Sequence, residues 1–533
     1  MKKRTIAAIL AALLLLGCLA GCTKSEEVTE SAAPSASDAG ASDVTDVSGD
    51  STTSDAAVEA AQSAAGASDA SYDAATATRI TADGNSFSVS GSGASVSGNV
   101  LTITEAGEYI LSGTLSDGQI VVDADKSDSV QIILDGASLS YSAGSVLYAK
   151  HGLITLTLAD GTENFVTDTA DYTFADGEDE PNAAVWSKDS LTVNGGGSLT
   201  VSANYKNGIL SKDDLVITDG TLTVTAVNDA LRGRDSVVIS GGTFDLTAGG
   251  DGIQSNNDED TEKGYVVILD GTFAITSTGD GIQAETSLTV LGGSFSVTTG
   301  GGSANSSTQT GGSWGAWGPS GGSATTDTSE TTDSAKGIKA SGDLVISGGT
   351  FLIDSSDDAL HSNANATIRG GDFAISSGDD GAHADGALLI EDGNITIDKS
   401  YEGLEGASVT VLGGTIDVTA SDDGLNAAGG NDSSSFGRPG ENTFESSADM
   451  FILISGGSLT VNAGGDGIDS NGTLSFTGGT VYVSGPTDNG NGALDTQGTC
   501  SITGGILVAA GSSGMAVAPG SDSTQCSVLV YYD

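Results

Sequence analysis

The chain has 533 residues, and its 18 Lys and Arg against 71 Asp and Glu give a formal net charge of -53. A surface this negative argues against nucleic acid as a partner, because clustered positive charge is what binds phosphate backbones. It also repels itself and any acidic polymer unless cations intervene, which points to divalent metal as a component of the protein.

The N-terminus is typical of a bacterial secretion signal. Three basic residues at positions 2–4 precede a short apolar run, and Leu-Ala-Gly-Cys follows, ending at Cys22. The run is too short for a membrane span and has the flanks of a signal peptide. The tetrad matches the lipobox of bacterial lipoproteins, so we expect residues 1–21 to be removed and Cys22 to carry lipid. The alternative is a plain signal peptide that contains a Cys.

Residues 22–78 are mostly Ser, Ala, Asp, Thr and Gly, with almost no large apolar side chains. Such a composition cannot bury enough surface to offset the entropy of ordering. We therefore expect a disordered tether, which holds the folded part at the extracellular face of the bacterial cell membrane.

From residue 79 to 533, short runs of Val, Ile, Leu and Phe alternate with polar residues and are punctuated by Gly and Asp, which is typical of strands and turns. The strands of 79–170 lack a regular repeat, as terminal capping rungs of a solenoid often do.

After Ser190 a repeat of about 22 residues is plain, in which two apolar strands flank a Gly-Gly or Asp-Gly turn. The longer intervals coincide with polar insertions at 256–263, 300–335 and 428–449. Insertions at a fixed phase of a repeat predict loops on one edge. The second turn residue marks each repeat at Gly197, Gly220, Gly242, Gly271, Gly293, Gly349, Gly371, Gly393, Gly414, Gly457, Gly479 and Gly505.

The repeat predicts an all-β fold, a right-handed single-stranded parallel β-helix with a rung of about 22 residues. One unit cannot bury its apolar face alone, but stacked units can. Leu344, Ile346, Phe351 and Ile353 show the period-2 pattern of inward side chains. The hand follows from the chirality of parallel crossovers. We expect a monomer. A β-sandwich array explains the constant period poorly, and the nine-residue period of a calcium β-roll is absent.

An acid also recurs at a fixed phase, before a Gly or Ala and then Ile, Leu or Ala. An unpaired charge in the core is prohibitively costly, so the Gly is expected to mark a bend that turns the acid outward. The acids are Asp229, Asp251, Asp280, Asp358, Asp380, Glu402, Asp423 and Asp466, and a second outward column contains Gln254, Gln283, His361, His383, Glu405, Asn426 and Asp469.

Stacked carboxylates one strand spacing apart, about 4.8 Å, repel by about 3 to 4 kcal/mol at an effective dielectric of about 20. Calcium takes oxygen ligands at about 2.3–2.6 Å, so an ion between rungs would remove the repulsion. The alternative is that these side chains only accept hydrogen bonds from turn N–H groups. We favour calcium over the run 357–426.

This run, together with Gly107–Gly113 and Leu158–Asn164, resembles the bacterial carbohydrate-binding β-helix family related to pectate lyases. The resemblance implies a right-handed parallel β-helix that binds calcium and plant cell-wall polysaccharide, cellulose or polygalacturonate, without established catalysis. Lys336-Gly337 and Asn207-Gly208 depart from the pattern, so we expect no ion on those rungs. By position, the family's calcium ligands fall among Asp358, Asp380, Glu402, Glu405 and Asp423.

Two sets of site residues follow from the columns and the resemblance. We expect the calcium ligands to come from Asp251, Asp280, Asp357, Asp358, Asp379, Asp380, Glu402, Glu405, Asp422, Asp423, Asp466 and Asp469. We expect ligand contacts from His361, His383, Asp385, Tyr401 and Asn426.

We therefore expect a surface-anchored protein that binds acidic pectin or cellulose in a calcium-dependent manner and has no catalytic residues. One alternative is a pectate-lyase-like enzyme, for which Lys399 and Arg369 are the best candidate bases. Another is a structural adhesin or surface spacer. Trp314 and Trp317 lie in a Gly/Ser insertion that we expect to be a disordered loop rather than a sugar contact, and Cys500 and Cys526 remain as a possible disulfide pair.

Overall fold

A computed structural model describes residues 58–59, 62–63, 66, 70–174, 177–306, 334–427, 449–487 and 490–531. The lipobox with Cys22 and most of the expected tether lie outside the described residues. Trp314, Trp317 and most of the 300–335 and 428–449 insertions also lie outside them. The described residues belong to one compact unit, residues 51–533. Within them, no helix is both long and apolar enough to cross a membrane.

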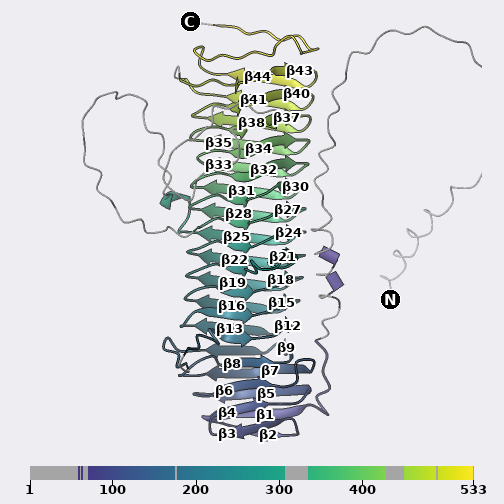
Figure 1. Cartoon of the computed structure of the whole chain (residues 1–533), viewed down its shortest axis with the longest axis vertical. Helices are drawn as coiled ribbons and strands as arrows, with labels where there is room; N and C mark the ends of the chain where they lie inside the picture. The colour runs from purple at the N-terminus through teal and green to yellow at the C-terminus, as the bar shows by residue number, and fades with distance from the viewer. Residues whose placement is uncertain are drawn as a thin grey trace, which may run out of the picture. The chain divides into compact units, whose positions relative to one another are not determined.

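Three stacks of parallel strands form the fold, and each turn of the chain adds one strand to each stack (Figure 1). The prediction of a parallel β-helix is confirmed. The first stack contains β10 (Glu163–Thr167), β13 (Ser198–Ala203), β16 (Thr221–Ala226), β19 (Thr243–Ala248), β22 (Thr272–Ser277), β25 (Ser294–Thr299), β28 (Thr350–Ser355), β31 (Asp372–Ser377), β33 (Asn394–Lys399), β35 (Thr415–Ala420), β38 (Ser458–Ala463), β41 (Thr480–Ser484) and β44 (Ile506–Ala510).

The other two stacks follow the same order. The second contains β11 (Ala183–Ser187), β14 (Asn207–Ser211), β17 (Leu231–Gly233), β20 (Ile253–Ser255), β23 (Ile282–Ala284), β26 (Ile338–Ala340), β29 (Leu360–Ser362), the first parts of β32 (Ala382–Ile390) and β34 (Leu404–Val411), β36 (Leu425–Ala427), β39 (Ile468–Ser470) and β42 (Asp495–Thr496). The third contains β12 (Leu191–Asn194), β15 (Asp214–Ile217), β18 (Ser236–Ile239), β21 (Tyr265–Ile268), β24 (Leu288–Val290), β27 (Leu344–Ile346), β30 (Ala366–Ile368), the second parts of β32 and β34, β37 (Phe451–Ile454), β40 (Thr473–Phe476) and β43 (Cys500–Ile502).

The N-terminal end of the stacks is closed by two antiparallel pairs, β1 with β2 and β3 with β4. These antiparallel pairs occupy only the first part of the segment 79–170, in which no repeat was visible, and β5 and β6 pair in parallel with β1 and β4. The strands of this end are β1 (Thr78–Gly84), β2 (Ser86–Ser90), β3 (Ala94–Ser97), β4 (Val100–Ile103), β5 (Gly107–Leu115), β6 (Gln119–Asp123), β7 (Ser129–Ser140), β8 (Leu147–His151) and β9 (Leu153–Leu158).

The core is filled by columns of like residues, because parallel in-register pairing puts equivalent positions of successive rungs next to each other. The clearest column is a stack of phenylalanine rings, with centroids 4.6 to 4.7 Å apart and nearly parallel planes. Its members are Phe244, Phe273, Phe295, Phe351 and Phe373, and all are buried.

The glycines that mark the repeat have a backbone reason. Gly349, between β27 and β28, has φ of 117°, a left-handed region that other residues rarely adopt. A Cβ there would also lie 3.1 Å from the Phe351 ring. All the marker glycines except Gly197 have a positive φ, so the turn into the first stack depends on them.

Residues 256–263 join β20 to β21, and the insertion 428–449 likewise falls between β36 and β37. The insertion 300–335 falls instead between β25 and β26, and η1 (Ser303–Asn305) follows β25. The insertions therefore occur at two phases of the repeat, and the expectation of a single phase is wrong. Cys500 and Cys526 are both free thiols in this structure, the first buried and the second exposed.

Replacing Phe295 by Ala should lower the free energy of unfolding by about 3–5 kcal/mol, because it opens a cavity between two stacked rings. Thermal unfolding followed by circular dichroism measures the loss. Leu352→Ala on β28 is the control, since Leu352 is 58% exposed and should change little. Equal shifts for both variants would contradict the role of the ring stack.

Candidate functional site

The acids lie at the bend between the first and second stacks, where each forms one position of a continuous column. We call this the bend column, and it contains Asn207, Asp229, Asp251, Asp280, Lys336, Asp358, Asp380, Glu402, Asp423 and Asp466. Beside it runs the strand column, set by the register of the second stack. Its members are Leu210, Arg232, Gln254, Gln283, Lys339, His361, His383, Glu405, Asn426, Asp469 and Asp495.

Each aspartate of the bend column accepts a hydrogen bond from a backbone N–H of the next rung. One carboxylate oxygen of Asp229 accepts a hydrogen bond from the backbone N–H of Asp251, at 3.1 Å. The same contact joins Asp358 to the N–H of Asp380 at 2.9 Å and Asp423 to the N–H of Asp466 at 2.6 Å. The alternative role considered for these residues was to accept hydrogen bonds from backbone N–H groups. That role accounts for one carboxylate oxygen of each aspartate.

The second oxygen faces the strand column, three residues further along the chain. Arg232 donates to Asp229 at 3.0 Å, and the His361 ring nitrogen Nδ1 lies 2.7 Å from Asp358. Glu402 accepts instead from the strand-column residue of the following rung, Asn426, at 2.8 Å. The two columns therefore form one network along the stack.

The acids point away from the apolar core, as predicted, but they are not at a solvated surface. Asp358 is fully buried and Asp380 is 2% exposed. The small residue after each acid, Gly or Ala, faces the core, where Ala359 is fully buried and a Cβ on Gly281 would lie 2.5 Å from Val297. Its neighbour must then face the other way. Neighbouring rungs cover the acids, which a single repeat could not reveal.

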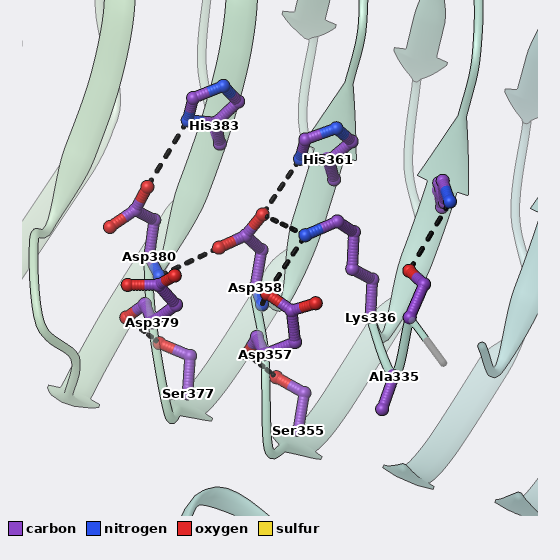
Figure 2. A network of polar contacts seen from close by, with 12 residues as sticks. Ala335, Lys336, Ser355, Asp357, Asp358, His361, Ser377, Asp379, Asp380 and His383 are labelled. Carbon is purple, nitrogen blue, oxygen red and sulfur yellow. Dashed lines mark hydrogen bonds and ion pairs between the residues drawn. The ribbon is translucent and has the colours of Figure 1, made fainter. Parts of the chain in front are cut away.

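Lys336 occupies the bend column where the other rungs carry an acid or Asn. Its backbone N–H donates to Asp280, while its ammonium contacts Asp358 at 2.7 Å and Asp357 at 2.9 Å (Figure 2). Burial would raise the pKa of Asp358, but Lys336 and His361 hold it well below its usual range. Lys336 thus supplies a covalently attached cation to this rung, and the expectation of an ion-free rung at 336–337 remains a prediction.

His383 lies among three carboxylates. Its Nδ1 is 3.2 Å from Asp380 and 2.8 Å from Glu405, and its Nε2 is 3.2 Å from Asp385. Burial would lower the pKa of His383, but these contacts raise it well above its usual range. The ring stacks on His361, with centroids 4.9 Å apart (Figure 2).

Beyond His383 the acids outnumber their cationic partners. No Lys or Arg within the described residues pairs with Glu402, Glu405 or Asp423. Burial and neighbouring acids raise the pKa of Glu402 and Asp423 well above their usual range, and raise that of Asp469 to about 7. Buried carboxylates without cations are therefore concentrated in the C-terminal part of the columns.

Three groups of side chains bring at least three donor atoms within 4.8 Å of one another. They are Asp357, Asp358 and Asp379; Asp380, His383 and Glu405; and Asp423, Asp466 and Asp469. Lys336 already reaches the first group. The third group contains only oxygen donors, which suit calcium.

Asn426 supplies a further indication beside this third group. Its amide nitrogen donates to Glu402, while its carbonyl oxygen is buried and has no hydrogen-bond partner in the structure. It is paired in register with Asp469 on the following rung. An unpartnered buried carbonyl beside three carboxylates is the donor set that a hard divalent cation would satisfy.

The other expected residues have separate positions. Burial and a hydrogen bond to Asp422 raise the pKa of Tyr401, so both belong to the network. Asp251 and Asp280 are not part of a three-donor group among the described residues. Burial and the acids at 280 and 229 raise the pKa of Asp251 to about 7.

The two basic residues considered for catalysis are engaged elsewhere. Arg369 lies 4.0 Å from Glu391, and each directly follows a strand of the third stack, β30 and β32. The Lys399 ammonium donates to the backbone oxygen of Ser303.

The cationic side chains in the N-terminal half of the columns were not predicted from the sequence. Arg232 pairs with Asp229, and the Lys339 ammonium lies 3.5 Å from Asp280. Their signal was present, because both residues fall at the phase of the strand column. Only their contacts reveal that they neutralise the acids.

Three comparisons bear on this site. A family model described as carbohydrate-binding domain-containing protein matches residues 97–381 and 380–528. A relative of that description from Acetivibrio thermocellus is 43% identical over 136 residues, which are 25% of this chain and 48% of the relative, so about half of that relative is matched. A solved structure, the polysaccharide lyase-like protein from C. thermocellum as a gadolinium derivative, is 40% identical, with a TM-score of 0.42, and covers 42% of this chain and 92% of its own.

Replacing Lys336 by Met should lower the free energy of unfolding by about 3–5 kcal/mol at neutral pH, because it leaves two buried carboxylates without their cation. Chemical denaturation measures this loss. Lys263→Met is the matched control, because Lys263 also contacts an acid, at 2.6 Å, but is 44% exposed and should lose about 1 kcal/mol or less. If the Lys336 variant loses no more than the control, Lys336 is not the compensating charge.

Proposed function

This chain belongs to the carbohydrate-binding domain-containing protein family, and on that premise we propose that it binds plant cell-wall polysaccharide in a calcium-dependent manner. The observation that carries the proposal is the extent of the match, which runs through nearly all the strands of the β-helix. The resemblance carried by the run from Asp357 to Gly429 is confirmed at the level of the family.

The donor sets at the C-terminal end of the columns support calcium as the cation. Asp423, Asp466 and Asp469 would hold it, with the carbonyl oxygen of Asn426 as a further oxygen donor. Asp380 and Glu405 form the second candidate set together with His383. A bound dication would neutralise Glu405 and Asp423, with which no Lys or Arg of the described residues pairs.

The engagement of the basic residues supports binding without catalysis. A lyase needs a base beside the substrate's acidic C–H group. Arg369 pairs with Glu391 and Lys399 with the backbone of Ser303, both outside the three donor groups. Lyase activity is the alternative, and a purely structural surface spacer is another. The protein would act as a monomer.

Wild-type protein should bind calcium in an isothermal titration and should be retained on polygalacturonate or cellulose, with retention lost after chelation. Asp466→Asn combined with Asp469→Asn should weaken calcium binding by about tenfold or more, because two oxygen ligands lose their charge. Asp417→Asn is the control, since Asp417 is exposed on β35 outside both columns.

Each other outcome selects an alternative. Absence of calcium binding in the millimolar range would contradict the calcium proposal. Retention on no polysaccharide would favour the spacer. Release of unsaturated products that absorb in the ultraviolet would favour a lyase.

We also propose that Cys22 anchors the protein, through lipid, at the extracellular face of the bacterial cell membrane. Wild type should partition into the detergent phase, and Cys22→Ala should move to the aqueous phase, because only the lipid would hold it there. Phase separation with Triton X-114 followed by immunoblotting measures the distribution. Identical partitioning of the two proteins would rule out lipidation at Cys22.

A further inference from the structure

We propose that the glycan lies in a groove on the N-terminal half of the two columns, continuing onto an aromatic platform at its end, and that this groove selects neutral rather than acidic glycan. This inference rests on the proposed polysaccharide binding and names where it occurs. The groove lies in a part of the columns that is distinct from the three donor groups, although Asp251 and Asp280, two of the expected calcium ligands, line it.

The groove has a volume of about 430 Å³. Four successive rungs line it, with Arg232, Asp251, Gln254, Asp280, Gln283 and Lys339 among the lining residues. Because the rungs succeed one another along the stack, the groove runs in the same direction as the strand column. A linear polymer lying along it would meet the same kind of polar side chain at each rung.

Hydrogen-bonding capacity in the groove matches hydroxyl groups. Gln254 and Gln283 each have a buried carbonyl oxygen without a hydrogen-bond partner. Arg232 and Lys339 add N–H donors, and Asp251 is an acceptor. Since a hydroxyl group both donates and accepts, a sugar can satisfy both kinds of group.

The charge of the groove favours a neutral sugar. Its lining includes three carboxylates, at Asp229, Asp251 and Asp280, and two cations, at Arg232 and Lys339. Both cations already pair with these acids, with 3.0 Å between Arg232 and Asp229 and 3.5 Å between Lys339 and Asp280. A uronate would add negative charge where acid is already in excess, whereas a neutral hexose would not.

An aromatic platform continues the groove toward the N-terminus. Tyr172 stacks on Tyr205 with ring centroids 4.3 Å apart, and Phe174 packs at an angle against both. All three are half-buried, so part of each ring remains accessible. The Tyr172 hydroxyl donates to Asp168 at 2.6 Å, which fixes the cluster in place.

The platform occupies the same bend as the acid column. Tyr172 follows β10 and Tyr205 follows β13, and the next bend, after β16, carries Asn228 of the groove. The backbone N–H of Asn228 donates to the Lys206 carbonyl at 2.9 Å, so groove and platform are adjacent. The C–H face of a sugar ring packs on an aromatic ring while its hydroxyls stay at the polar edge, so stacking and groove contacts can be made together.

The test measures titration of cellohexaose and of hexagalacturonate into wild-type protein and variants. Tyr205→Ala, and separately Gln254→Ala with Gln283→Ala, should each weaken cellohexaose binding at least tenfold and leave calcium binding unchanged. Tyr482→Ala is the matched control, because Tyr482 is 48% exposed on β41 near the other end of the stack. Thermal unfolding establishes that each variant is folded.

The failures are distinguishable. If wild type binds cellohexaose and both sets of variants bind it with wild-type affinity, the groove is wrong while the proposed function stands. If wild type prefers hexagalacturonate, the selectivity for neutral glycan is wrong. If wild type binds neither oligosaccharide and is retained on no polysaccharide, the proposed function itself fails.

Discussion

The repulsion between like charges on adjacent rungs is the constraint on which the rest of this structure depends. A parallel β-helix repeats each position at one strand spacing, so any acid placed at a fixed phase of the repeat faces another acid. In the apolar interior the same repetition is favourable, because the phenylalanine rings stack face to face. Outside it, each rung needs a cation, a hydrogen-bond donor or a proton.

The two halves of the columns meet this requirement differently. In the N-terminal half, Arg232, Lys339 and Lys336 bring cations that belong to the chain itself. In the C-terminal half the positions of the strand column hold His383, Glu405 and Asn426, and no Lys or Arg of the described residues pairs with Glu402, Glu405 or Asp423. The N-terminal half is thus neutralised by side chains of the chain itself, whereas the C-terminal half is suited to an external dication.

Much of the fold could be predicted because one physical requirement repeats many times. Period-2 apolar residues such as Phe351 and Ile353 predicted the strands and the core. The phase of Asp358 relative to its glycine turn predicted that the acids form a column. These features depend on neighbours in the sequence and on the rung spacing alone.

The site was less predictable because its contacts join residues whose side-chain directions no repeat specifies. Lys336 stood out only as a departure from the acidic pattern, and its contact with Asp358 depends on the direction of a long flexible side chain. The stacking of Tyr172 on Tyr205 joins two turns of different length and composition. The burial of Asp358 depends on its neighbours in space.

The hydrogen bond that each bend aspartate accepts from the next rung has an evolutionary consequence. Since Asp358 accepts from the N–H of Asp380 as Asp229 accepts from that of Asp251, successive rungs use the same joint. Duplication or loss of one complete rung would therefore leave these hydrogen bonds between the remaining rungs intact. An insertion or deletion of one residue within a rung would break the hydrogen bonds to both neighbouring rungs. Evolution can therefore lengthen or shorten this protein most readily in whole rungs.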